Sequence, residues 1–132
     1  MKLDHIGIAV EDITESNKLF AKLLGKQPLK EEDVISQHVK VSFFDAGESK
    51  LELLQATGSE SPIAKFLIKN KPGVHHVAFK VTDIHEAAKE MEAEGFEVIT
   101  KPPKKGADNK LVVFLHPKTT NGVLVELCQE IE

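Results

Sequence analysis

An internal repeat constrains the fold of this chain more than any other feature. The residues from His76 to Ile84 match those from His5 to Ile13 at a constant offset of 71 residues. In both copies an apolar run opens with histidine and closes at an aspartate, which predicts a strand followed by the start of a helix. A repeat of this kind indicates one structural unit made twice.

Each copy predicts a strand, a helix and three further strands. A strand from Lys2 to Val10 precedes a helix that Asp12 caps and Gly25 ends, and Asp83 and Gly95 repeat these signals in the second copy. The other strands are expected at residues 27–30, 39–44 and 50–55, and at 96–100, 110–115 and 122–129, with loops at 31–37 and 101–109.

The fold class predicted from this pattern is α+β, with two tandem βαβββ modules. We expect a single domain over residues 1–132, with the first module at 1–57 and the second at 73–132. Residues 58–72 are expected to hold a connecting helix, because Ser61 suits the N-cap position and Pro62 the first helical position.

Composition argues against several classes of partner. Seventeen basic and twenty-one acidic residues give a net charge of -4, so no basic field favours nucleic acid or an anionic membrane. No apolar run approaches the roughly 18 residues of a membrane span, and the N-terminus shows no secretory signal pattern. The single cysteine, Cys128, is expected to be a buried apolar side chain, and we expect a reducing cytoplasmic location.

Four side chains with metal-binding chemistry occupy equivalent positions in the repeat. His5 and His76 open the first strand of each half, while Glu52 and Glu126 match in the last strands at an offset of 126 minus 52, or 74. Two imidazoles and two carboxylates suit a divalent transition metal and contain too much nitrogen for a calcium site.

Structural explanations also exist for these residues. A histidine that opens a strand is often only an edge residue, but the recurrence of His5 at His76 favours the ligand role. Glu52 could belong to a solvent-facing alternation. Glu126 lies in an otherwise apolar run, where a carboxylate needs a partner such as a metal ion. His75 points to the opposite face from His76 and is expected to be structural.

Several segments resemble the methylmalonyl-CoA epimerases of the vicinal oxygen chelate superfamily. The similar segments cover essentially the whole chain: His5 to Val10, Ser61 to Leu67, Gly73 to Phe79, Phe114 to Lys118 and Gly122 to Gln129. The strand-opening histidine is widespread in that superfamily. The turn His116-Pro117-Lys118, which leads into the run Gly-Val-Leu-Val-Glu-Leu, is much more particular to the epimerases.

The resemblance implies a cytosolic homodimer that acts on an acyl-CoA substrate, with a divalent metal in a cup formed by one mixed sheet of the two modules. By position the ligands are His5, His76 and Glu126, and Glu52 stands where some members carry glutamine. Cobalt or manganese is the expected metal, with zinc and nickel as further options.

The implied reaction removes a proton from the carbon between a thioester and a carboxylate and returns it on the other face, through an enediolate. Glu126 is the candidate for one catalytic base. Some epimerases carry the second base as a glutamate on the third strand of the first module, where residues 37–42 here hold no carboxylate. His38, Lys40 and Glu52 remain open as alternatives.

Substrate contacts are predicted at Lys118 and His116, in the turn before the last strand, and at Lys40. The lysines 104, 105 and 110 could meet the CoA phosphates or form a solvated loop. Two other functions stay open: a lactoylglutathione lyase of the glyoxalase I type, which the His116 turn disfavours, and a metal-free binding module, which has no need of four ligand-type side chains.

Overall fold

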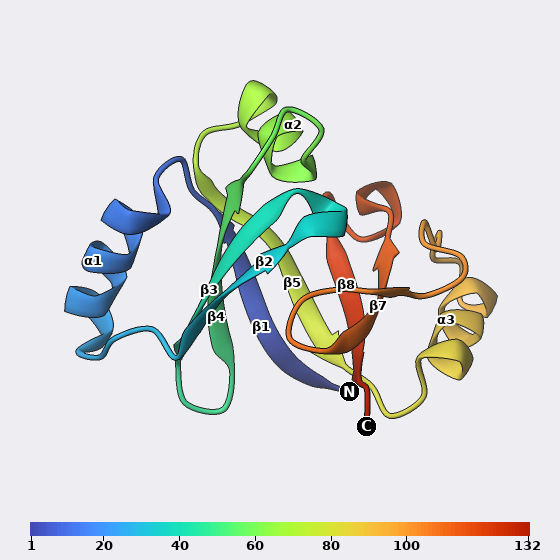
Figure 1. The fold of residues 1–132 in the computed structure, drawn as a ribbon. Coiled ribbons are helices and arrows are strands. Elements are labelled where there is room, and N and C mark those ends of the chain that lie inside the picture. The colour runs from blue at the N-terminus through green and yellow to red at the C-terminus, as the bar shows by residue number, and fades with distance from the viewer. The chain divides into compact units, whose positions relative to one another are not determined.

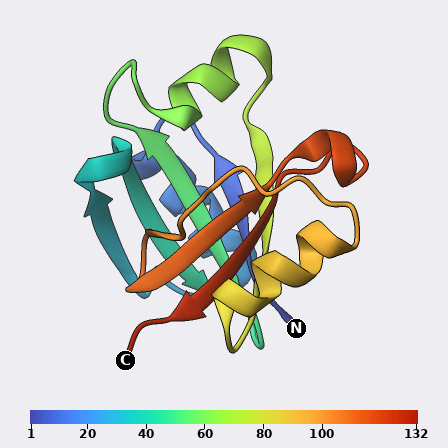
Figure 2. The same ribbon diagram turned by 90° about the vertical axis from the view of Figure 1, so that its right-hand side faces the viewer.

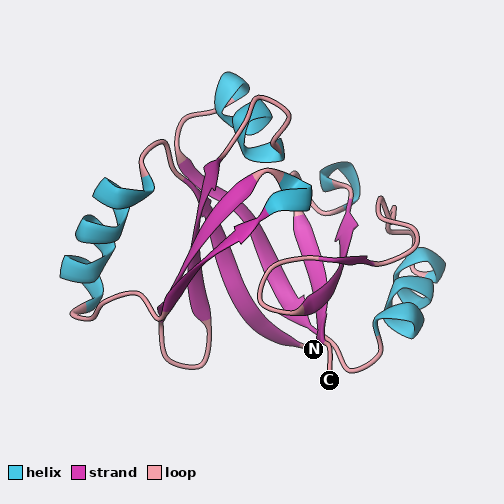
Figure 3. Ribbon diagram, viewed as in Figure 1, coloured by secondary structure: helices cyan, strands magenta, loops and turns pink.

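Each half of the chain folds into a βαβββ module (Figures 1 and 3). The computed structural model describes residues 1–132, which form two units. We call His5–His75 the first module, and His76–Glu132 together with Met1–Asp4 the second module. The predicted α+β class and the tandem repeat are confirmed. No helix combines the length and the apolar character that a membrane crossing requires.

The first module builds its sheet in the order β2-β3-β4-β1. Its strands are β1 (Lys2–Ala9, of which residues 5–9 lie in this module), β2 (Lys30–Val34), β3 (Val39–Asp45) and β4 (Lys50–Ala56). Its helices are α1 (Ile13–Leu24), the 3-10 turn Ile35–Gln37 and the connecting helix α2 (Pro62–Lys69). Strands β1 and β4 are parallel and the other pairs are antiparallel, so the first and last strands of the module lie side by side.

The second module repeats this arrangement in the order β5-β8-β7-β6. Its elements are β5 (Gly73–Lys80, of which residues 76–80 lie in this module), α3 (Ile84–Ala93), β6 (Lys104–Lys105), β7 (Lys110–Leu115), the 3-10 turn Pro117–Thr119 and β8 (Val125–Glu130). Strands β5 and β8 are parallel. Figure 2 shows α3 lying across the sheet that β7 and β8 form.

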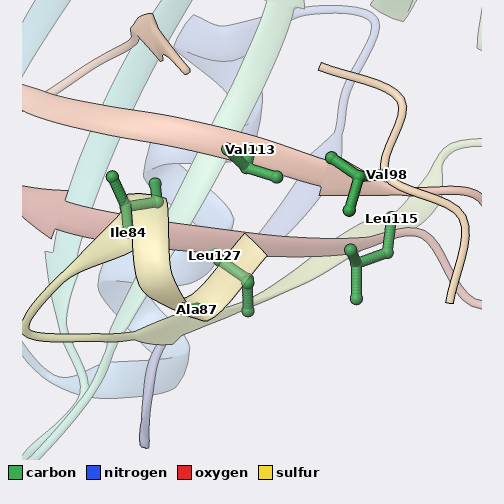
Figure 4. Packing of buried hydrophobic residues seen from close by; sticks show 6 residues of the cluster. All are labelled: Ile84, Ala87, Val98, Val113, Leu115 and Leu127. Carbon is green, nitrogen blue, oxygen red and sulfur yellow. The ribbon is translucent and has the colours of Figure 1, made fainter. Parts of the chain in front are cut away.

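One face of each sheet packs against the helix of its own module. In the second module the cluster contains Ile84, Ala87, Val98, Val113, Leu115 and Leu127 (Figure 4). The first module has the equivalent cluster of Val10, Ile13, Phe44 and Leu53. Because side chains alternate along a strand, the residues between these apolar positions point to the opposite face. His5, Glu52, His76 and Glu126 are on that opposite face.

The starts of α1 and α3 are held by equivalent hydrogen bonds in the two modules. The Asp12 carboxylate accepts from the first turn of α1, and Asp83 does the same for α3. Gln55 Oε1 accepts from the backbone N–H of Ile13 at 2.7 Å, and Gln129 Oε1 accepts from Ile84 at 2.7 Å. Each last strand therefore holds the helix start of its own module, because these N–H groups have no partner within the helix.

The second strand of each half is where the prediction is wrong. In the first module the strand covers Lys30–Val34 instead of residues 27–30. In the second module residues 96–100 hold only an isolated bridge from Val98 to Leu115, and the short strand β6 falls inside the predicted loop. Both observed strands are edge strands rich in charged residues, which protect an open sheet edge but give no apolar pattern to detect.

Candidate functional site

The first module places an imidazole beside a carboxylate on the face of the sheet opposite α1. Glu52 on β4 is in register with Gly7 of β1, two residues beyond His5 and on the same face. His5 Nδ1 lies 3.1 Å from Glu52 Oε2, and each residue is only 3% exposed. The buried carboxylate thus has an immediate partner in its own module.

The second module repeats this pair. Glu126 on β8 is in register with Ala78 of β5, the counterpart of Gly7. His76 Nε2 lies 3.3 Å from Glu126 Oε1, and the two residues are 5% and 6% exposed. The ring of Phe114 meets the His76 ring edge-on, with 6.0 Å between centroids, and so restricts its orientation. All four candidate ligands are therefore buried, each histidine beside the glutamate of its own module.

These two pairs have the chemistry of metal ligands. Imidazole nitrogen and carboxylate oxygen together suit divalent transition metals, and a buried carboxylate is costly unless an opposite charge or a hydrogen-bond donor accompanies it. Within each module the imidazole and the carboxylate lie side by side. That His5, Glu52, His76 and Glu126 bind one common ion stays a prediction.

Lys118 and His116 stabilise the turn in which they lie. His116 Nδ1 accepts a hydrogen bond of 3.0 Å from the backbone N–H of Lys118, which caps the 3-10 turn. Lys118 Nζ lies 2.8 Å from Glu97 Oε1, and this hydrogen bond holds the pKa of Glu97 below its usual value. The predicted contacts of these residues with substrate stay predictions, and Lys118 is exposed enough to reach one.

Lys40 lies on the other face of the first module from Glu52. It is in register with Gln55, whose side chain holds the start of α1, and its own Nζ lies 3.7 Å from Glu31 Oε1. His38 has a left-handed backbone, with φ 53°, after the 3-10 turn and lies 3.3 Å from the Glu60 carboxylate. The structure brings neither residue to the His5 and Glu52 pair within this module.

The lysines near Gly106 have two different environments. Lys104 and Lys105 are exposed on β6, where a phosphate could reach them. Lys110 is only 4% exposed, and its Nζ lies 2.6 Å from Asp4 Oδ2 and 3.7 Å from Asp108 Oδ2. Burial acts to lower the pKa of Lys110, but the hydrogen bond and charge of Asp4 outweigh it and raise this pKa. Lys110 is therefore a buried cation of the second module.

Two residues that the sequence marked as structural behave accordingly. Cys128 is free and fully buried, and burial, together with the charges of Asp4 and Glu126, raises the pKa of its thiol. A thiol that stays protonated is a poor nucleophile. His75 packs edge-on against the ring of Phe66, with 5.0 Å between centroids.

Glu32 is a candidate that the sequence analysis missed. It lies in register with Val41, and Val41 is in register with Leu54. Glu32 therefore projects from the same face as Glu52, whereas its neighbour Glu31 faces α1 and accepts a hydrogen bond from Asn17. The sequence predicts a loop at residues 31–37, whereas the structure places β2 over Lys30–Val34. The charged edge strand carries no apolar alternation that could have revealed it.

Comparisons with known proteins identify relatives over nearly the whole chain. Residues 4–114 match the model of the Glyoxalase/Bleomycin resistance protein/Dioxygenase superfamily. The mitochondrial methylmalonyl-CoA epimerase of Dictyostelium discoideum is 42% identical over 96% of this chain and 76% of its own length. The ethylmalonyl-CoA/methylmalonyl-CoA epimerase of Cereibacter sphaeroides is 40% identical over 97% of both chains.

A solved structure agrees with these sequence matches. A single-residue variant of Streptomyces coelicolor methylmalonyl-CoA epimerase, in complex with 2-nitronate-propionyl-CoA, superimposes with a TM-score of 0.92. The match covers 100% of this chain and 99% of that chain, at 33% sequence identity.

Proposed function

The chain belongs to the methylmalonyl-CoA epimerases of the Glyoxalase/Bleomycin resistance protein/Dioxygenase superfamily, and we propose that it interconverts the (2R) and (2S) epimers of methylmalonyl-CoA. The observation that carries this proposal is the pair of equivalent buried sites, His5 with Glu52 and His76 with Glu126. An enzyme that stabilises a developing negative charge needs such buried polar groups, whereas a simple apolar binding cup does not.

The ligand of the Streptomyces relative supports this reaction. A nitronate is a planar, delocalised anion, as is the enediolate formed when methylmalonyl-CoA loses its α-proton. A protein that binds a stable anion of this shape is suited to the unstable one, because catalysis requires tighter binding of the charged species than of the neutral substrate.

We assign a divalent metal, cobalt or manganese, to His5, Glu52, His76 and Glu126, with the sheets of the two modules forming one cupped mixed sheet. The whole-chain match to the Streptomyces structure supports this arrangement, and the mixed imidazole and carboxylate donors suit such an ion. Bound there, the ion would supply Lewis-acid stabilisation of the negative charge that develops on the thioester and carboxylate oxygens.

The two glutamates are the proposed bases. Epimerisation removes a proton on one face of the α-carbon and returns it on the other, so two bases on opposite sides are required. Glu126 and Glu52 occupy equivalent strands of the two modules, which suits opposite sides of the substrate. Each carboxylate has two oxygens, so one can meet the imidazole or the ion while the other exchanges the proton.

The resemblance to the family also suggests an assembly and a location. We propose a homodimer that works in the cytoplasm, where a protein with one free, buried cysteine needs no disulfide. Sedimentation of the purified protein tests the dimer, which a sedimenting mass close to 14.6 kDa would exclude.

Exchange of the α-proton of methylmalonyl-CoA with deuterium from solvent tests the function. We expect exchange and epimerisation by the purified protein, a loss on the order of 10²-fold or more after chelation, and recovery with Co²⁺ or Mn²⁺. The hemithioacetal of glutathione serves as the control substrate. Undiminished exchange by chelated protein would exclude the metal role, and turnover of the hemithioacetal alone would exclude the epimerase.

A further inference from the structure

The boundary between the two modules falls inside the first strand of each repeat. Met1–Asp4 of β1 belong to the second module, whereas Gly73–His75 of β5 belong to the first. The changeover falls at the peptide bonds Asp4–His5 and His75–His76, which are equivalent positions in the repeat. Asp4 and His75 immediately precede the candidate ligands His5 and His76.

The two preceding residues are held by different contacts. His75 packs edge-on against the Phe66 ring of α2, an aromatic contact of modest strength. Asp4 accepts a charge-assisted hydrogen bond of 2.6 Å from Lys110 Nζ. Both partners are largely buried, with side-chain exposures of 5% for Lys110 and 13% for Asp4.

The ion pair is not required to build a βαβββ module. The first-module position equivalent to Lys110 is Val39, because Val39 faces Ala56 in register as Lys110 faces Glu130. Val39 is a buried apolar residue. Replacing a buried ion pair by apolar residues is often neutral or stabilising, so stability alone gives no reason for a lysine here.

A buried ion pair does fix position, because its hydrogen bond has one direction and one length. Asp4 and His5 are neighbours in the chain, and consecutive Cα atoms lie about 3.8 Å apart. Any shift of Asp4 therefore moves the backbone that carries the His5 ring. The ring itself remains against Glu52 only while that backbone stays in place.

We infer that the Asp4–Lys110 ion pair is a positioning element for the proposed metal ligand His5: it fixes Asp4, and with it the backbone that carries the His5 ring. This inference rests on the proposed metal-dependent epimerase. Lys110 acts through Asp4 and the backbone, without contact with substrate.

The test compares the Co²⁺ affinity of purified variants by calorimetry. The double variant D4N/K110M removes both charges with little change in shape, and so avoids the unpaired buried carboxylate that K110M alone would leave. K110R keeps the charge and serves as the conservative rescue. K80M is the matched control, because Lys80 makes an exposed ion pair of 2.9 Å with Glu130 in the same module.

We expect D4N/K110M to fold, as judged by circular dichroism, and to bind Co²⁺ about 10–100-fold more weakly, as is usual when a group that orients a metal ligand is lost. K110R and K80M should bind as wild type does. Wild-type affinity in a folded D4N/K110M variant would overturn the positioning role and leave the epimerase proposal intact. Wild-type protein that binds no Co²⁺ would overturn the metal site, and this inference with it.

Discussion

The two modules share the parts that hold the candidate metal ligands and differ in the parts that surround them. The histidine strand, the glutamate strand and the helix that Asp and Gln side chains cap repeat position by position. The second strand does not, since β2 has five residues and β6 only two. The turn before the last strand also differs: it spans residues 46–49 in the first module but 116–124 in the second, where it includes a 3-10 turn.

This contrast separates the requirements for binding a metal ion from those for binding the substrate. The proposed metal ligands are equivalent in the two modules, so the strands that carry them are the parts that the duplication preserves. An acyl-CoA has a small reacting end and a long polar tail, so no twofold-symmetric surface can match all of it. The segments that differ between the modules are therefore where we expect contacts with substrate.

The largest effect is expected when one proposed base is replaced at a time, because each module is proposed to supply one of them. We expect E126Q and E52Q each to lower kcat for epimerisation by about 10²–10⁴-fold, the usual contribution of a positioned base. Each variant should retain deuterium exchange with one epimer of methylmalonyl-CoA and lose it with the other. The epimer that still exchanges should be opposite in the two variants.

E32Q provides the control, because Glu32 projects from the same face as Glu52 but lies two strands away. It should epimerise at close to the wild-type rate. If E126Q and E52Q lost exchange with the same epimer, the assignment of one base to each module would be wrong. A large loss in E32Q would instead identify Glu32 as the base of the first module.

The helix-facing cores allow a matched comparison of stability. Leu53 and Leu127 are equivalent and are almost fully buried against α1 and α3. We expect L53A and L127A each to cost about 2–5 kcal/mol of unfolding free energy. If the modules form the predicted single domain, both variants should shift one common calorimetric transition. Two separate transitions, each sensitive to one variant, would show that the modules unfold independently.

The glutamine side chains at the helix starts predict a smaller, symmetric effect. Q55L leaves the Ile13 N–H without its acceptor, and Q129L does the same to Ile84. Each should cost about 1 kcal/mol in urea unfolding, the typical net value of a hydrogen bond. Because both residues lie on the helix side of their sheets, Co²⁺ affinity should be unchanged. Markedly unequal costs would show that the two helix starts are not equivalent.

The smallest effect is expected for Lys118 and Glu97, a pair present only in the second module. The hydrogen bond from Lys118 lowers the pKa of Glu97 from its ordinary 4.5, so its stabilisation is present above that pH and is lost as the pH falls through the lowered pKa. K118M should therefore melt slightly below wild type at pH 7 and level with it in strong acid. Because the pair is exposed, salt should also remove the difference.

The sequence predicted strands and helix starts well where they carry an apolar alternation or a capping residue. The strand from Lys110 to Leu115 was placed without error, and the N-caps Asp12, Ser61 and Asp83 were each identified. The charged edge strand β2 was misplaced, because edge residues are selected to discourage pairing with other chains and carry no apolar alternation. Glu32 was missed for the same reason.

Comparison of the two halves determined, without any coordinates, that His5 and His76 are equivalent and that Glu52 and Glu126 match them, since a repeat is a property of residue order alone. Only the tertiary structure decided that each imidazole lies within 3.1–3.3 Å of its carboxylate, and that Lys110 is buried against Asp4 rather than available to a phosphate. Strand register sets the first result, because it pairs strands that are distant in the sequence. The second result is a side-chain contact between residues 106 positions apart, and no local pattern encodes either distance.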